Sequence, residues 1–159
     1  ATVSARRDHV HGSTAFTSDI SVKVHNDAAQ SISNDTTTTL AFNTEDFKTV
    51  TGMHDNSTNN SRLIATTDGK YLVIGQIEWA DNTTGSRWLQ IINQDGATQA
   101  TVGGPTVTAT SVSMGQVISA LIDMDADDYV YMATRQNSGG SLNASTPRTM
   151  FSMMKIASP

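Results

Sequence analysis

Two of the chain's four histidines lie two residues apart near the start of the sequence, behind Arg6 and Arg7. In an extended chain, residues i and i+2 project to the same side, so His9 and His11 present two imidazoles together. One chain supplies too few ligands for a stable site, but three chains around a threefold axis supply six nitrogens. Six nitrogens suit an octahedral transition-metal ion such as Fe²⁺, with Ni²⁺ or Zn²⁺ as substitutes. The pair therefore predicts a metal ion on the axis of a trimer.

The segment around this pair is polar, and Phe16 is its only large aromatic residue. We expect residues 1–18 to form an extended arm that cannot build a core, and a shared ion would hold three such arms together. Asp8 is placed to accept the second ring N–H of a histidine. Two alternatives stay open: an arm ordered by other contacts without metal, and a solvated arm whose histidines bind nothing.

A run of aspartates lies in the second half of the chain, where Asp123, Asp125 and Asp127 occupy alternate positions in "DMDADD". The first three ligands of an EF-hand loop have this spacing. The glycine that such a loop requires is replaced by Asp128, and the distal glutamate is missing, so the run is not an EF-hand. It predicts either a simpler Ca²⁺ site at the apex of a loop or an acidic turn in solvent.

Two polar stretches, residues 54–60 and 137–145, are rich in Asn and Ser, which is typical of loops. Binding sites concentrate on loops carried by a rigid scaffold. We therefore take as candidates for receptor contact His54, Asp55, Asn56, Asn59, Asn60, Asn137, Ser138 and Asn143. Serines lie near the His–Asp pair, but no Gly-x-Ser-x-Gly turn places a nucleophile beside it. We expect no enzymatic activity.

The bulk composition excludes several classes of protein. A length of 159 residues indicates a single domain. A net charge of -5 argues against a general nucleic-acid binder, which needs a basic surface. The chain has no cysteine, so disulfides and thiolate metal sites are excluded. No apolar run approaches the length that spans a bilayer, so we expect no membrane insertion.

Alternation of apolar and polar residues is the main structural signal of the chain. The stretch "KYLVIGQIEW" places a set of residues on one face of a strand, namely Tyr71, Val73, Gly75, Ile77 and Trp79. We expect "SRWLQIINQDG" to complete a long antiparallel hairpin with it. About eight to ten strands and no helical period predict an all-β sandwich or jelly roll over residues 19–159, with the strand aromatics in the core or at a subunit interface.

From about Leu40 to Ile156, the order of these signals resembles the jelly-roll family of tumour necrosis factor and the complement globular heads. The resemblance lies in "LAFNTEDF", "SRLIATTDGKYLVIGQIEW", "DADDYVYM" and the C-terminal "MFSMMKIA". The family usually has a Gly-Asp turn before its penultimate strand, where this chain has Asp127-Asp128. The resemblance implies a homotrimer. In addition, "ARRDHVHG" looks like a connector of tailed-phage fibre and virion proteins.

Taken together, the two resemblances imply a structural protein of a phage virion, joined to other virion proteins through its arm. The expected function is that of a trimeric receptor-binding tip of a tail fibre or spike, which contacts a glycan or protein on the host surface. One alternative is a capsid decoration protein. An alternative of another class is a secreted sugar-binding module.

Overall fold

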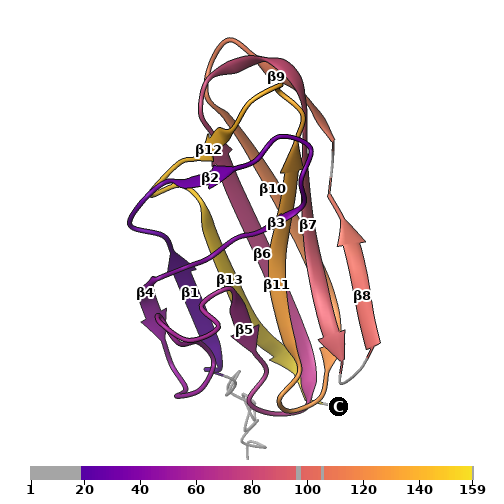
Figure 1. Ribbon diagram of the computed structural model, residues 1–159. Coiled ribbons are helices and arrows are strands. Elements are labelled where there is room, and N and C mark those ends of the chain that lie inside the picture. Colours follow the sequence, from indigo (N-terminus) through magenta and orange to yellow (C-terminus); the bar gives the residue numbers. More distant parts are fainter. Residues whose placement is uncertain (1–18, 96–97, 105, 159) are drawn as a thin grey trace, which may run out of the picture.

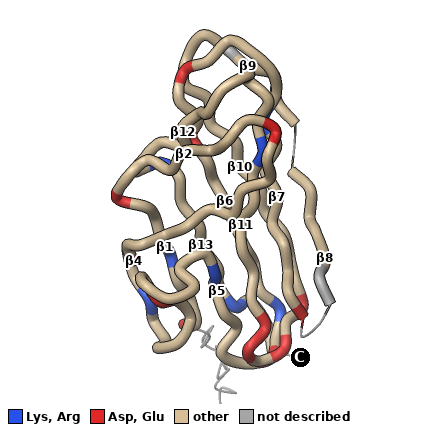
Figure 2. The backbone as a smooth tube through the Cα atoms, in the orientation of Figure 1, with Lys and Arg blue, Asp and Glu red and all other residues tan. Residues whose placement is uncertain are grey.

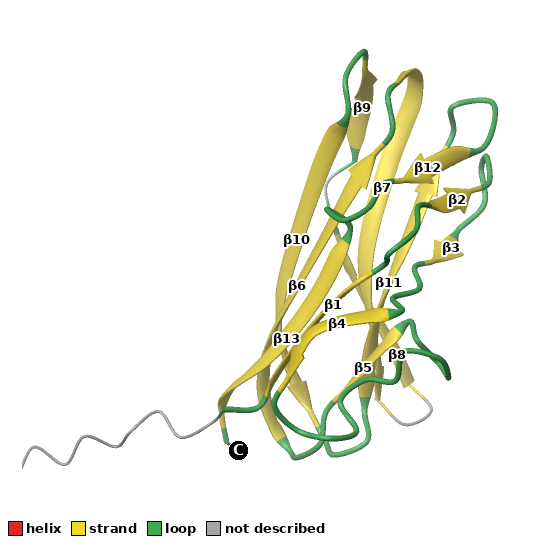
Figure 3. Ribbon diagram, turned by 90° about the vertical axis from the view of Figure 1, so that its left-hand side faces the viewer, coloured by secondary structure: helices red, strands yellow, loops and turns green. Residues whose placement is uncertain are grey.

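Two antiparallel β-sheets packed face to face make up the fold. The computed structural model describes residues 19–158 apart from 96, 97 and 105 (Figure 1), and Figure 3 shows the two layers from the side. His9, His11 and the rest of the arm lie outside the described residues. The described part of the chain contains no helix, and hence no helix that could cross a membrane, which confirms the all-β prediction.

One layer, the β6 sheet, contains seven strands. They are β1 (Ser21–His25), β2 (Gln30–Ile32), β4 (Thr44–Lys48), β6 (Gly69–Trp79), β10 (Met114–Met124), β12 (Leu142–Ala144) and β13 (Met150–Ala157). Across most of the sheet the order is β4-β1-β13-β6-β10, and β12 joins the end of β6 and carries β2 beside it.

The other layer, the β7 sheet, contains six strands. They are β3 (Thr38–Thr39), β5 (Arg62–Ile64), β7 (Asn82–Asp95), β8 (Thr98–Gly103), β9 (Val107–Thr110) and β11 (Tyr129–Gln136). The central pair is β7 with β11. The described residues therefore form more strands than the eight to ten expected, because several edge pieces are only two or three residues long.

The two ends of the sandwich differ in what they carry. At one end β1 begins and β13 finishes, since Ser21 pairs with Met154. We call this the arm end, because residue 18 precedes it. At the distal end lies Trp79, which pairs with Met114 and Ala144.

The core lies between the sheets and follows the predicted alternation. Tyr71, Val73, Ile77 and Trp79 of β6 are fully buried, which confirms the face assigned from the sequence. At Gly75 the sheets approach closely, because a Cβ there would lie 2.7 Å from the Met132 sulfur. Across the core the rings of Phe42 and Phe151 stack at 5.7 Å.

The expected hairpin of β6 and β7 is wrong. Each strand lies in a different sheet: β6 pairs with β10 over its whole length, and β7 pairs with β11. Both strands turn an apolar set inward, Tyr71 and Val73 from one and Leu89 and Ile91 from the other. Two such faces cover one another across a core, so the connection after Trp79 passes from one sheet to the other instead of folding back within one sheet.

Candidate functional site

The 51–61 loop lies between β4 and β5 near the arm end. The buried side chain of His54 connects this loop to the backbone of neighbouring segments. This side chain is only 3% exposed. Its Nδ1 lies 2.9 Å from the carbonyl oxygen of Arg62, and its Nε2 lies 3.1 Å from that of Phe42. Because carbonyl oxygens only accept, the ring nitrogen that carries the proton donates to the carbonyl it faces, and the ring bridges the two backbone segments. His54 thus holds the loop in place and is not displayed for a receptor.

The tip of this loop is organised by Asp55. Its Oδ1 accepts hydrogen bonds at 2.8 Å from the backbone N–H groups of Ser57 and Thr58 and from the Ser57 hydroxyl. These donors, the Thr58 N–H first, lower the pKa of the Asp55 carboxyl to about 2. Asn56 and Asn59 are exposed, so these two display amides to solvent.

The second predicted stretch lies at the distal end. Asn137 accepts a 2.6 Å hydrogen bond from the backbone of Ser86, and the Ser138 N–H donates to Gln136 Oε1 at 2.7 Å. Asn143 is exposed on β12. The structure therefore places the two candidate loops at different parts of the sandwich, and they do not form one site (Figure 1).

The three alternating aspartates do not converge either. Asp123 at the end of β10 forms an ion pair with Lys70 at 2.8 Å. Asp125 and Asp127 lie in the turn before β11, where the charge of Asp68, more than any other cause, raises the pKa of Asp125. Within the described part of the chain, no three His, Cys, Asp or Glu side chains form a group that could hold a metal ion. Figure 2 shows the resulting concentration of acidic residues at the arm end.

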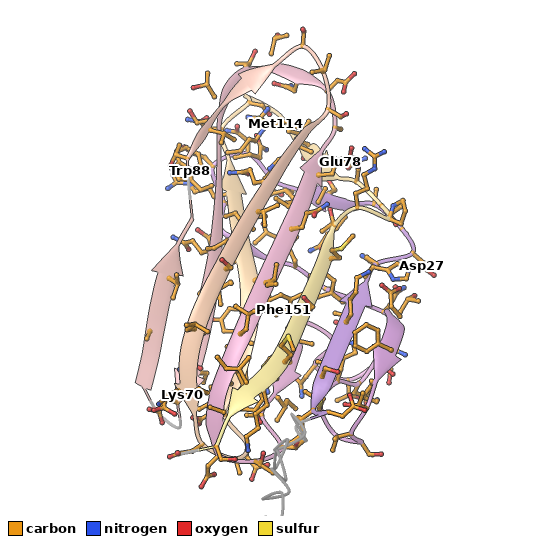
Figure 4. The ribbon with its side chains drawn as sticks, turned by 180° about the vertical axis from the view of Figure 1, so that it is seen from behind. Asp27, Lys70, Glu78, Trp88, Met114 and Phe151 are labelled. Carbon is orange, nitrogen blue, oxygen red and sulfur yellow. The ribbon has the colours of Figure 1, made fainter. Side chains whose placement is uncertain are left out.

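The outward face of the β6 sheet is unusually apolar. Five large side chains on it are exposed, listed with their exposed fractions: Phe47 49%, Ile74 39%, Val117 57%, Leu121 69% and Met154 39%. They come from β10, β6, β13 and β4, which follow one another in this order across the sheet, with β1 between β13 and β4 (Figure 4). Soluble monomers rarely leave a contiguous face of this kind uncovered. The sequence carried the signal, because Ile74 alternates with the buried set of β6.

A second feature is the aromatic content of the opposite surface, the outward face of the β7 sheet. Trp88, Tyr129 and Tyr131 alternate with buried core residues and are half-buried on the outside. Tyr71 and Trp79 lie in the core, as the sequence predicted for the aromatic residues of the strands. Trp88, Tyr129 and Tyr131 do not lie in the core, so for these three rings a core position is wrong. Strand placement alone does not say which face of the strand a ring occupies.

Comparison with known proteins supports the fold. No family model matches the chain, and no curated protein matches it. Murine APRIL at pH 5.0 is similar in structure, with a TM-score of 0.66 at 14% identity, covering 85% of this chain and 97% of APRIL. Eiger TNF from S. frugiperda gives 0.60 at 13% identity, covering 88% and 94%. The globular domain of zebrafish complement 1qA gives 0.58 at 11% identity, covering 85% and 93%.

These likenesses extend over nearly the whole of each matched domain while the sequences share little identity. At this level of identity, the similar structures show only that this chain shares their fold. The chain has the jelly-roll fold of tumour necrosis factor-like proteins and complement globular heads.

Proposed function

We propose that this chain is a non-enzymatic attachment module that works as a homotrimer, assembled through the apolar outward face of the β6 sheet. The observation that carries the proposal is the set of five exposed side chains headed by Leu121 and Val117. Two hollows in the same face, of about 230 and 220 Å³, are ready to receive side chains of a neighbour. One is lined by Phe47 and Met154, and the other by Leu121 and Ile156.

The edge of this sheet favours a closed ring. Among the described strands, β10 pairs only with β6, so its other edge has no hydrogen-bonded neighbour. An open edge beside exposed apolar residues invites association, which natural proteins direct into specific interfaces. A rotation that brings β10 of one copy onto the β1–β13 region of the next closes after three copies, as the family resemblance implies.

The attachment role places this trimer at the tip of a phage tail fibre or spike. The arm precedes the arm end, so the distal end with Asn137, Ser138 and Asn143 points away from the particle. The exposed side chains of Asn137 and Asn143, with the half-buried Ser138 beside Asn137, suit contact with a receptor on the host surface. In this proposal, His9 and His11 bind the transition-metal ion that ties three arms together, and the arm joins other virion proteins.

Three experiments test this function. Light scattering of the purified protein is expected to give the mass of three 16.9 kDa chains, about 51 kDa. A stable monomer at micromolar concentration contradicts the assembly. Electron microscopy of virions labelled with antibody against the chain is expected to mark the tail tip. Label on the capsid supports the decoration role instead, and no label on virions removes the phage assignment. Elemental analysis of the trimer, with His9→Ala/His11→Ala as the control, is expected to find one metal ion per three chains.

A further inference from the structure

A pocket of about 270 Å³ opens on the outward face of the β7 sheet, close to the distal end. It is lined by Thr37, Trp88, Gln90, Thr134 and Arg135. Trp88 and Arg135 are directly opposite one another on β7 and β11. The volume is near the lower end for small-molecule sites, which combine an aromatic or apolar wall with a few placed polar groups.

The polar groups of this pocket are held beside the indole ring. The Arg135 guanidinium lies 5.6 Å from the centre of the Trp88 ring and forms a 2.6 Å ion pair with Asp35. At this distance the guanidinium packs over one face of the ring, so a ligand would use the part of the half-buried ring that stays exposed in the pocket. The pocket thus offers the Arg135 guanidinium, which donates and is paired with Asp35 outside the lining, and the Gln90 amide, which both donates and accepts.

A second pocket, of about 210 Å³, opens farther along the same face. Its lining is Thr39, Ser61, Arg62, Gln94, Tyr129 and Tyr131. The two tyrosine rings lie 6.2 Å apart, and the Arg62 guanidinium lies 4.1 Å from the centre of the Tyr129 ring. Among the described residues Arg62 makes no ion pair, so this pocket carries a positive charge that the first pocket, with its Arg–Asp pair, does not.

The two pockets are joined by one strand. Trp88 lines the first and Gln94 the second, and both project from the same side of β7. Six residues at about 3.4 Å each separate them by roughly 20 Å. Between them the outward side of β7 carries Gln90 and Ile92, and Tyr131 lies opposite Ile92 on β11, so amides and aromatic or apolar side chains are mixed along this line. A pyranose ring has a matching surface, since its axial C–H groups form an apolar face and its hydroxyls lie at the rim.

We propose that the outward face of the β7 sheet binds an oligosaccharide, with one sugar ring against Trp88 in the first pocket and a later one in the second pocket, beside Tyr131 and the Arg62–Tyr129 pair. Arg135 and Gln90 bind the hydroxyls of the first ring, and Asp35 holds Arg135 in position. Arg62 favours a sugar that bears a carboxylate at the second position. The site lies on the opposite side of the sandwich from the β6-sheet interface, so all three copies in a trimer present it.

This inference rests on the proposed attachment function for its biological setting, but binding at the site is tested independently of it. The full chain is titrated by calorimetry with cellohexaose, chitohexaose, maltohexaose and hexagalacturonate, after a screen on an array of bacterial-surface oligosaccharides. At least one of these is expected to bind. Trp88→Ala is expected to weaken binding about tenfold or more, because it removes the stacking surface, whereas Trp88→Phe retains most of it.

Two further variants define the site. Arg62→Gln is expected to weaken the uronate selectively and to leave neutral oligosaccharides within about twofold, since a neutral amide still donates hydrogen bonds. Leu121→Asp, on the opposite face, is expected to leave the affinity per chain unchanged even when it dissociates the trimer. Circular dichroism confirms that each variant is folded.

The outcomes separate the two proposals. If no oligosaccharide binds at millimolar concentration, or if Trp88→Ala binds as tightly as the parent, the inference is wrong even when the trimer and its tip location stand. If Trp88→Ala instead changes the oligomer size and no sugar binds, the face is a contact between copies. If an oligosaccharide binds in a Trp88-dependent way but the antibody does not label the tail tip, the attachment function is wrong and the binding site stands.

Discussion

Replacing Leu121 by Asp tests the assembly most sharply. Leu121 projects from β10, is 69% exposed in one chain and lines a hollow of about 220 Å³. Burying a whole leucine side chain contributes about 1.5–3 kcal/mol. The fraction still exposed therefore corresponds to about 1–2 kcal/mol at each interface, or about 3–6 kcal/mol for the three interfaces of a closed ring. The carboxylate would add its own desolvation cost.

The expected result is a loss of at least about 100-fold in the association constant of the trimer, because each 1.4 kcal/mol corresponds to tenfold. The folded single chain should keep its free energy of unfolding within about 0.5 kcal/mol, since the side chain is on the surface there. Analytical ultracentrifugation across a concentration series measures the first quantity, and urea unfolding of the dissociated variant measures the second.

A matched control is Val112→Asp. Val112 is 63% exposed and lies between β9 and β10, outside the five-residue set on the β6 sheet, so the same apolar-to-acid change should leave the trimer intact. If Leu121→Asp remains trimeric with the parent's dissociation constant, the β6 sheet is not the interface. If both variants dissociate, the interface is wider than the apolar face.

Three further predictions concern the loops. His54→Ala should lower the free energy of unfolding by about 1–3 kcal/mol in urea, because a buried carbonyl oxygen loses its donor; an unchanged midpoint contradicts the proposed role of His54 in holding the loop. The folded-state pKa of Asp55 is depressed, so its loop bonds are present at neutral pH and are lost as pH falls toward about 2. A carboxyl NMR midpoint near 3.8 would show that the Asp55 bonds do not form in solution. Gly85→Ala should lower the thermal unfolding midpoint more than Gly139→Ala does. Both glycines have positive φ, at 76° and 90°, but only at Gly85 would a Cβ meet the Asn137 backbone. Equal decreases in the midpoint would indicate that the φ strain alone is responsible.

The sequence was informative where one periodicity decides the answer. The alternation in β6 gave the buried face, and the absence of a helical period gave the all-β class. The pairing of strands was harder to predict from the sequence. The strands β6 and β7 are adjacent in the chain, and apolar and polar residues alternate in both. Nothing in their own residues indicates whether two such strands share a sheet or face each other across a core. That choice depends on β10 and β11, which lie far along the chain and occupy the neighbouring positions instead.

The loop residues show a related limit. His54 stands in a run of polar residues, which is typical of a solvent-exposed loop, yet its ring is enclosed by the carbonyl groups of Arg62 and Phe42. A buried histidine that bridges two backbone segments leaves no periodic trace, because its partners are main-chain atoms whose position does not depend on their residue type. Asn56 and Asn59 are exposed, as the polar composition of the loop predicts, whereas His54 in the same loop is buried.

The two outward faces differ in a way that fits the proposed assembly and the proposed binding site. On β6, Leu72 and Ile74 on the outer side alternate with Tyr71 and Val73 on the inner side, so this part of the strand is apolar on both faces. A strand of that kind is typical of a sheet covered on both sides, and in a two-layer fold the second cover must come from another molecule. On β7 the outer side instead carries Trp88, a tryptophan surrounded by polar groups. An interface that excludes water needs the first pattern, whereas a ligand with hydroxyl edges needs the second. The two patterns lie on opposite sides of the sandwich, so the proposed assembly would leave the proposed binding face open.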